Sequence, residues 1–155
     1  MPDITNGSMI QGQDFPASVY DSDDVGIFNI TNNTYIPGDT EVGVRFVAPS
    51  SGRVRITVGG GTRDNNAVDR IFISPQILYA DRPAEFLAPS VTFLGLGGSP
   101  ANTEMKYGSR SGLVEGLTPG ETYYARVMFT CAAGGSAPAG QADIGAREII
   151  VIPVP

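Results

Sequence analysis

Short runs in which apolar and polar residues alternate recur along the chain. From Glu41 to Phe46, and again from Arg53 to Val58, every second residue is apolar, and glycine, arginine or polar residues stand between them. A period of two places alternate side chains on opposite faces of a β-strand. Both runs therefore predict strands of an antiparallel sheet that has one face in water. Residues 48–52, between the runs, contain proline and glycine and predict either a hairpin turn or a corner between two sheets.

The rest of the chain carries further strand signals and no helical one. No window of eleven residues free of glycine and proline has the apolar spacing of a helix. Six more runs predict strands at residues 68–74, 76–80, 91–96, 103–107, 121–131 and 148–154, with Pro75 marking a bend. Glycine-rich loops are expected at residues 59–66, 94–101 and 132–140. This pattern predicts an all-β fold, a single antiparallel β-sandwich with either an immunoglobulin- or fibronectin-like or a jelly-roll strand order.

Composition supports this fold, and the N-terminus stands apart from it. With 20 glycines and 12 prolines in 155 residues, the chain has turn-forming residues for many short strands. Residues 1–18 lack the alternation, so we expect an extended N-terminal arm at residues 1–18 and a sandwich domain at residues 19–155. One interpretation of the arm is a frayed terminus. The other is a segment that becomes ordered on a neighbouring subunit through its isolated apolar residues, Ile4, Met9, Ile10 and Phe15.

Charge and hydropathy limit the classes of partner. Ten basic and sixteen acidic residues give a net charge of −6, and Lys106 is the only lysine. Nucleic-acid-binding surfaces cluster lysine and arginine because phosphate neutralisation dominates their affinity, whereas these arginines are scattered. The apolar run from Ile149 to Ile152 is too short to cross a bilayer, and residues 1–5 lack the features of a signal peptide. We therefore expect no nucleic acid and no membrane as partner, and synthesis in a cytoplasm.

The residue inventory argues against catalysis. The chain has no histidine, and Cys131 is its only cysteine. This composition excludes Ser-His-Asp and Cys-His catalysis, an internal disulfide, and zinc or iron–sulfur sites built from histidine and cysteine. A pair of catalytic carboxylates stays formally open, but no motif brings two glutamates together. We expect no catalytic residues, no cofactor and no metal, and hence a binding protein rather than an enzyme.

One short motif resembles a known structural device. Leu117 begins the sequence Leu-Thr-Pro-Gly-Glu-Thr-Tyr, which ends at Tyr123. This segment is similar to the tyrosine corner of fibronectin type III domains. The resemblance implies that Leu117 is a core leucine and that Tyr123 is the corner tyrosine. Because a buried hydroxyl needs a partner, we expect that of Tyr123 to bond the backbone of the 117–120 turn.

A broader set of segments resembles small virion-associated proteins from tailed phages of actinobacteria. These segments are Ala-Pro-Ser-Ser-Gly-Arg-Val at 48–54, Val-Gly-Gly-Gly at 58–61, Arg-Asp-Asn at 63–65, Phe-Ile-Ser-Pro-Gln at 72–76, the 116–127 stretch and Arg-Glu-Ile at 147–149. The resemblance implies a non-enzymatic capsid decoration or tail-associated protein, located in the virion. We expect a decoration or cement protein outside the assembled head, a homo-oligomer whose arm bridges the major capsid protein or another virion protein.

The alternative is a tail- or baseplate-associated module that binds a carbohydrate or receptor. Such a module would use aromatic and arginine side chains from the loops of the sandwich, namely Tyr79, Arg82, Tyr107 and Arg110. The absence of tryptophan counts against this interpretation.

Overall fold

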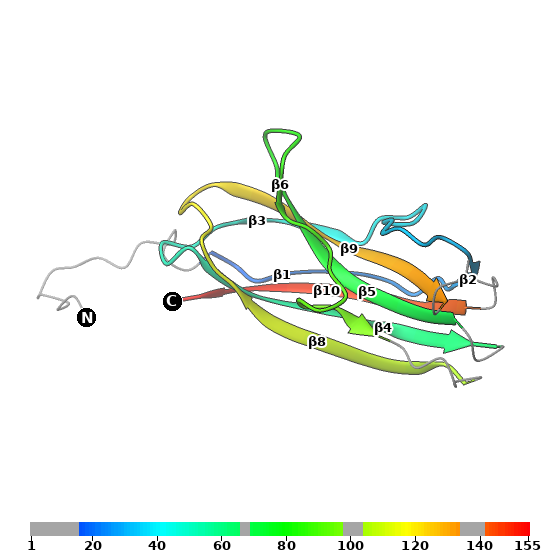
Figure 1. Ribbon diagram of the computed structural model, residues 1–155. Helices are drawn as coiled ribbons and strands as arrows, with labels where there is room; N and C mark the ends of the chain where they lie inside the picture. Colours follow the sequence, from blue (N-terminus) through cyan, green and yellow to red (C-terminus); the bar gives the residue numbers. More distant parts are fainter. Residues whose placement is uncertain (1–15, 66–68, 98–103, 134–141) are drawn as a thin grey trace, which may run out of the picture.

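The computed structural model describes residues 16–65, 69–97, 104–133 and 142–155, which form ten strands and no helix (Figure 1). The strands are β1 (Val19–Asp23), β2 (Ile27–Ile30), β3 (Gly43–Val47), β4 (Arg53–Asp64), β5 (Asp69–Tyr79), β6 (Glu85–Leu87), β7 (Leu96–Gly97), β8 (Lys106–Val114), β9 (Thr122–Ala133) and β10 (Ala142–Val154). They pack as two antiparallel sheets, so the predicted all-β sandwich is confirmed. Within these residues, no helix is long and apolar enough to span a membrane.

The order of the strands is that of a jelly roll. Sheet A runs β1-β10-β4-β8, and β2 also pairs with β10. Sheet B runs β3-β9-β5-β6, and β7 also pairs with β5. If the short β2 and β7 are left out, successive strands alternate between sheet A and sheet B. The one exception is the step from β5 to its neighbour β6, both in sheet B. This order corresponds to two Greek keys, which together make a jelly roll. The structure thus selects the jelly roll from the two predicted orders, and residues 48–52 form a corner between sheets rather than a hairpin.

Alternation along the long strands builds the core between the sheets. Except for Ala125, the inward residues of β4 and β9 are branched or aromatic, and burial of each such side chain contributes about 1.5–3 kcal/mol. The following residues are at most 1% exposed: Val54, Ile56, Val58, Tyr123, Ala125, Val127 and Phe129.

The predicted tyrosine-corner residues lie at the edge of this core. Leu117 is 3% and Tyr123 0% exposed, and the Tyr123 hydroxyl accepts a hydrogen bond of 3.0 Å from the Thr118 amide. The same hydroxyl donates to Glu121, whose carboxylate also pairs with Arg82 at 2.7 Å. Burial pushes the pKa of Glu121 upward, but hydrogen bonds from Arg82, Tyr123 and Thr118 outweigh it and hold that pKa below its ordinary value. The corner therefore occurs here within a jelly roll.

The glycine-rich loop predicted at residues 59–66 is wrong for its first part, because β4 continues to Asp64. Gly59, Gly60 and Gly61 all pair with β8, and Gly59 and Gly60 also pair with β10. A Cβ at Gly59 would lie 2.5 Å from Glu148 Oε1, and one at Gly61 2.8 Å from Tyr107 Cε1. Glycine in this strand is therefore explained by the close approach of neighbouring side chains and not by a turn.

Three further predictions differ from the structure. β5 runs through Pro75, which pairs with Val127 of β9. On the other edge of β5, β7 pairs at Ile73 and β6 at Ile77, so no strand beside Pro75 on that edge requires its missing amide hydrogen. The strand predicted at 91–96 is reduced to β7, and Phe93 is 49% exposed. The strand predicted at 103–107 is instead β8, which begins at Lys106 and continues through a stretch that contains glycine and serine. β8 lies at the edge of sheet A and is largely exposed, so its sequence lacks the alternating apolar residues of a core strand.

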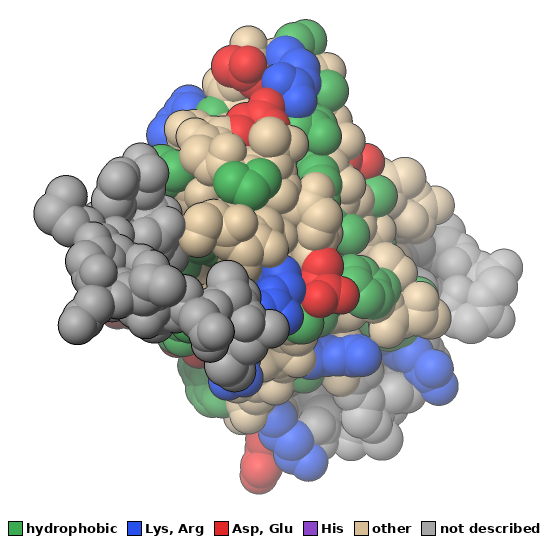
Figure 2. Space-filling view, turned by 90° about the vertical axis from the view of Figure 1, so that its left-hand side faces the viewer, with side chains coloured by type: hydrophobic (Ala, Val, Ile, Leu, Met, Phe, Trp, Pro, Cys, Tyr) green, Lys and Arg blue, Asp and Glu red, His purple; other side chains and the backbone are tan. Residues whose placement is uncertain are grey.

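The two ends of the sandwich differ in character. The end at which β10 finishes carries both signs of charge among small apolar groups (Figure 2). β2 and the segment that follows it lie at the opposite end (Figure 1). That end holds the feature described next.

Candidate functional site

A groove of about 610 Å³ opens at the end of the sandwich where β2 lies. Its lining comes from β2 and its neighbours, the 36–40 segment, Phe129 of β9 and Arg147 of β10. Val25, Phe28 and Ile36 leave 69%, 59% and 36% of their surfaces exposed there. Apolar side chains gathered in the open mark a binding surface. We call this surface the β2 groove.

A buried carboxylate on β10 fixes β2. Asp143 is 1% exposed and accepts hydrogen bonds from the Asn29 amide at 2.9 Å, from Arg63 Nε at 2.9 Å and from Asn65 at 3.1 Å. Its charge is thus compensated by an arginine and its oxygens are bonded, as a buried carboxylate requires. Asn29 has a φ of +58°, a left-handed conformation that asparagine tolerates better than most residues.

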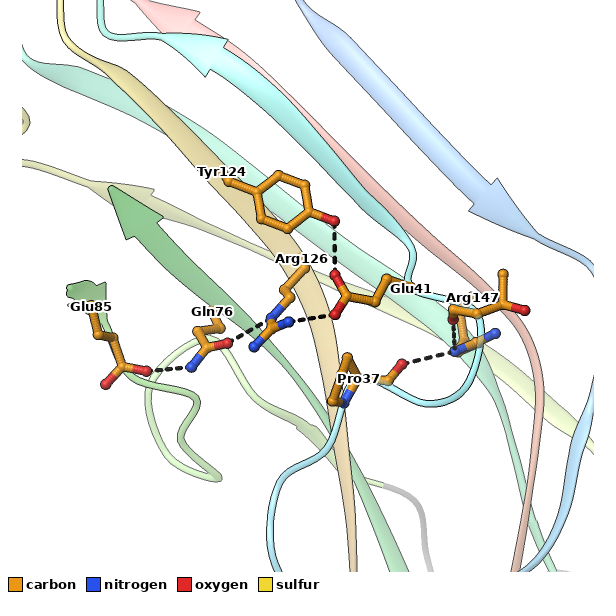
Figure 3. Close-up of polar contacts among 8 residues, drawn as sticks. Pro37, Glu41, Gln76, Glu85, Tyr124, Arg126 and Arg147 are labelled. Atoms are coloured by element: carbon orange, nitrogen blue, oxygen red, sulfur yellow. Dashed lines mark hydrogen bonds and ion pairs between the residues drawn. The ribbon is translucent and has the colours of Figure 1, made fainter. Parts of the chain in front are cut away.

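A buried cation on β10 fixes the other wall of the β2 groove. Arg147 is 1% exposed; its Nη2 pairs with Asp23 Oδ2 at 2.5 Å, and its Nη1 donates to the carbonyls of Pro37 at 3.3 Å and Thr40 at 3.2 Å (Figure 3). Between these carbonyls Gly38 has a φ of +86°, and a Cβ there would lie 3.1 Å from Nη1. One guanidinium therefore ties the 36–40 segment to the end of β1 and to β10 of sheet A.

A β-bulge in β10 places Arg147 in the interior. Ile144 pairs with Thr62 and Arg147 with Gly60, so two residues of β10 stand where β4 has only Gly61. In a regular strand, residues three apart face opposite sides. Here Ile144 and Arg147 are both buried, because the extra residue shifts the alternation.

A chain of polar contacts on the outer face of sheet B supports the 36–40 segment from its far end (Figure 3). Arg126 donates to Gln76 at 2.7 Å and to Glu41 at 2.6 Å, and Tyr124 donates to Glu41 at 3.1 Å. Gln76 in turn bonds Glu85 of β6. Burial and the hydrogen bond to Glu41 raise the pKa of Tyr124. The segment lining the β2 groove is thus fastened at Arg147 and again at Glu41.

Tyr35 lies immediately before this segment. Its hydroxyl is buried and, among the described residues, has no hydrogen-bond partner. Burial raises the pKa of Tyr35 to about 12. No three acidic or cysteine side chains in the described ranges lie close enough together to hold a metal ion.

The structure distributes the predicted binding residues over separate places. The arm residues Ile4, Met9, Ile10 and Phe15 lie outside the described residues. Of the four predicted for a carbohydrate module, Arg82 covers the Tyr79 ring at 3.6 Å from its centroid. Arg110 donates to the Gly95 carbonyl at 2.7 Å, whereas Tyr107 stands on the outer face of sheet A and is 69% exposed. These four residues do not form one site.

The β2 groove has no counterpart among the sequence predictions. Its key residues, Asp143 and Arg147, lie 80 and 124 positions from their charged partners, Arg63 and Asp23. Their pairing follows from strand order, which one sequence does not reveal. The signal that was available is the exposed apolar Val25-Gly26-Ile27-Phe28 run next to an aspartate-rich segment.

Comparison with known proteins gives no family. No family model matches the chain, and no curated protein matches it. Among solved structures, Eiger TNF from S. frugiperda is similar over 89% of this chain and 93% of its own, with 12% identity and a TM-score of 0.43. Dimeric latent PorU from Porphyromonas gingivalis is similar over 88% of this chain and 12% of its own, with 10% identity and a TM-score of 0.37. Likenesses this distant carry no argument about function.

Proposed function

We propose that this chain is a non-enzymatic structural protein of a phage virion, a decoration protein that binds the outside of the capsid. The observation that supports this proposal is the β2 groove, in which Val25, Phe28 and Ile36 are exposed on walls fixed by two ion pairs, each with one buried partner. A surface that is shaped before its partner arrives loses little conformational entropy on binding. Its occupant is an apolar segment of the major capsid protein or of another virion protein.

The charge around the β2 groove defines this partner further. Asp39 is exposed in its lining, while the cation Arg147 is buried and paired with Asp23. The whole chain carries a net charge of −6. A capsid segment with basic residues beside its apolar anchors would therefore associate faster than an acidic one.

The N-terminal arm supplies the second contact of the proposal. Pro16 lies beside Phe46 and Val47 of β3, in a shallow apolar surface away from the β2 groove. Fifteen residues precede Pro16, and an extended chain spans at most about 3.3–3.6 Å per residue, or roughly 50 Å. A protein with contacts at both ends can bridge neighbouring subunits, which is the action of a cement protein, and we expect it to do so as a homo-oligomer.

The experiment is a binding assay with undecorated capsids. Purified protein is mixed with capsids and separated by size-exclusion chromatography with light scattering, which also gives the oligomeric state. Phe28→Ser removes an apolar anchor of the β2 groove, and Phe93→Ser removes another half-exposed phenylalanine elsewhere. We expect Phe28→Ser to weaken binding about 30-fold, the effect of losing roughly 2 kcal/mol at an interface hot spot. Phe93→Ser should bind like the parent protein.

Two results would contradict the proposal. One is that the parent protein does not co-elute with capsids. The other is that Phe28→Ser and Phe93→Ser bind equally well, which would remove the β2 groove from the interface. Deletion of residues 1–15 tests the arm separately and should lower capsid affinity without unfolding the sandwich.

A further inference from the structure

A second surface lies on the outer face of sheet A, where several glycines in the middle of the sheet allow side chains of β8 and β10 to lie close to the backbone. Gly59 and Gly61 of β4 face outward, and Gly145 in the β10 bulge lies beside them. A basin of about 330 Å³ lies beside these positions, and two further glycines, Gly60 and Gly108, line it together with side chains of β1, β8 and β10. We call it the glycine basin. It is separated from the β2 groove by the Asp23–Arg147 pair.

Polar side chains cross the glycine basin in one row. The strand register places Ser22 of β1, Glu148 of β10, Gly59 of β4 and Ser109 of β8 at the same level. The Glu148 carboxylate leans over the floor, since its Oε1 lies 2.5 Å from the position of a Cβ on Gly59. Hydroxyl groups thus stand at both ends of the row, with a carboxylate between them.

Two exposed tyrosines flank this row on opposite sides. Tyr107 on β8 pairs with Gly61, and its ring lies across Gly61 and Gly145, with contacts of 2.8 Å and 3.3 Å from Cε1 to the Cβ positions. Tyr20 lies on β1, two residues to the other side of Ser22. They are 69% and 58% exposed. Since β1 and β8 are three strand spacings apart, the tyrosines stand at least ~14 Å from each other, which is wider than one sugar ring.

These features match the chemistry of a neutral sugar. An aromatic ring that lies against the protein with its other side in water offers a flat apolar platform. Serine hydroxyls and a carboxylate can donate to and accept from sugar hydroxyls, and the bonds to the carboxylate are the stronger ones. The ionisable groups that face the glycine basin are Asp24, Glu148 and the two tyrosine hydroxyls, whereas the guanidinium of Arg147 is buried and paired with Asp23. An anionic sugar would meet these carboxylates without a free cation, so it is disfavoured.

We propose that the glycine basin binds a neutral pyranose oligosaccharide of at least two residues, stacked on Tyr107 and hydrogen-bonded by Glu148, Ser22 and Ser109. This inference does not depend on a capsid partner for the β2 groove. It uses one of the residues that the sequence predicted for carbohydrate binding, Tyr107, together with Ser109 of β8, Ser22 of β1 and Glu148 of β10. In a particle-bound protein, the site would hold the particle against glycans of a surface.

The test uses isotope-labelled protein and NMR titration with maltose, cellobiose, lactose and N,N′-diacetylchitobiose. Weak single-site binding in the millimolar range is expected for at least one disaccharide, so the titrations extend to about ten times that concentration. Amide shifts should be confined to residues 20–24, 59–61, 107–109 and 145–148. Tyr107→Ala should weaken binding at least tenfold, and Glu148→Gln should weaken it less.

Controls separate binding from folding. Phe93→Ala removes an exposed aromatic ring outside the glycine basin and should leave the affinity unchanged. Because Tyr107 is itself exposed on an edge strand, Tyr107→Ala should keep the parental amide spectrum and melting temperature.

Three results would overturn the inference. They are the absence of shifts with all four disaccharides, shifts that persist in Tyr107→Ala, and tighter binding of the anionic sugar galacturonic acid than of any neutral one. None of them bears on capsid binding, and a failure of the capsid assay leaves this titration unaffected.

Discussion

Replacing Arg147 by methionine tests whether one buried ion pair holds the β2 groove together. The Arg147 side chain is 1% exposed and that of Asp23 13% exposed, so removal of the cation leaves a largely buried carboxylate without its partner. Breaking a buried pair in this way typically costs about 3–5 kcal/mol. Asp23 keeps some access to water, and the bonds to Pro37 and Thr40 are long. We therefore expect a loss at the lower end, about 3 kcal/mol of the free energy of unfolding.

The assay is urea unfolding followed by far-ultraviolet circular dichroism, with a double-mutant cycle. Asp23→Ala removes the carboxylate, and the double variant should be about 2 kcal/mol more stable than the sum of the single losses predicts. Arg55→Met, at an exposed position of β4, is the matched control and should change stability by less than about 0.5 kcal/mol. In a thermal scan the Arg147→Met loss corresponds to a melting temperature lower by roughly 6–12 °C.

Two results of the cycle would refute the reasoning. The first is a loss of less than about 1 kcal/mol for Arg147→Met, which is no more than a surface substitution with a small loss of packing costs. The second is that the two single losses of stability add without coupling between the positions. In either case the pair contributes little, and the shape of the β2 groove must come from the packing of its walls.

Three further substitutions probe the same region and the tyrosine corner. Gly38→Ala should cost about 1 kcal/mol more than Gly120→Ala in urea unfolding, because both have positive φ but only Gly38 is crowded. Tyr35→Phe should raise stability by about 1 kcal/mol by removing a buried, unbonded hydroxyl. The pKa of Tyr35 is about 12 in the folded protein and 10.0 in the unfolded chain. The stability of the parent protein should therefore fall as the pH rises from 10 toward 12, because only the unfolded chain loses the proton in this range. The phenylalanine variant should lack this fall. Tyr123→Phe should lower the free energy of unfolding by about 1–2 kcal/mol, because the hydroxyl loses its bonds to Thr118 and Glu121. It should also raise the pKa of Glu121, which NMR titration can measure. Because that pKa is lowered in the folded parent, Glu121 contributes stability that is lost as acid protonates it.

The fold follows from the sequence wherever alternation and side-chain size agree. The β3, β4 and β9 patterns place Phe46, Val54 and Tyr123 on the buried side, as the structure does. Prediction failed where a strand lacks that signature. Gly59–Gly61 look like a loop because the reason for glycine, the approach of Tyr107 and Glu148, comes from strands far along the chain. The same limit applies to Pro75, which is harmless only because of where β6 and β7 end.

The candidate sites follow from the sequence much less. Tyr107 could be selected as an exposed aromatic residue, but the partners of Tyr107 on β10 and β1 depend on jelly-roll order. Arg147 looks like one of several scattered arginines, and only the bulge reveals that it is buried. Local pattern thus determines which face of a strand is apolar, whereas the sites arise from contacts between strands, which a single sequence does not contain.

The bulge in β10 has a consequence for how this protein can change over generations. Side chains of a strand alternate between its two faces with a period of two. Loss of one codon between Ile144 and Arg147 would therefore move the buried side chains of one part of β10 to the outer face of sheet A, and the exposed ones to the core. That one event would expose either Ile144 or Arg147, empty part of the core and remove the floor of the glycine basin. Point substitutions on the outer face have no such effect. Descendants of this sequence should therefore vary in length at their loops and keep the residue count from 144 to 147 constant.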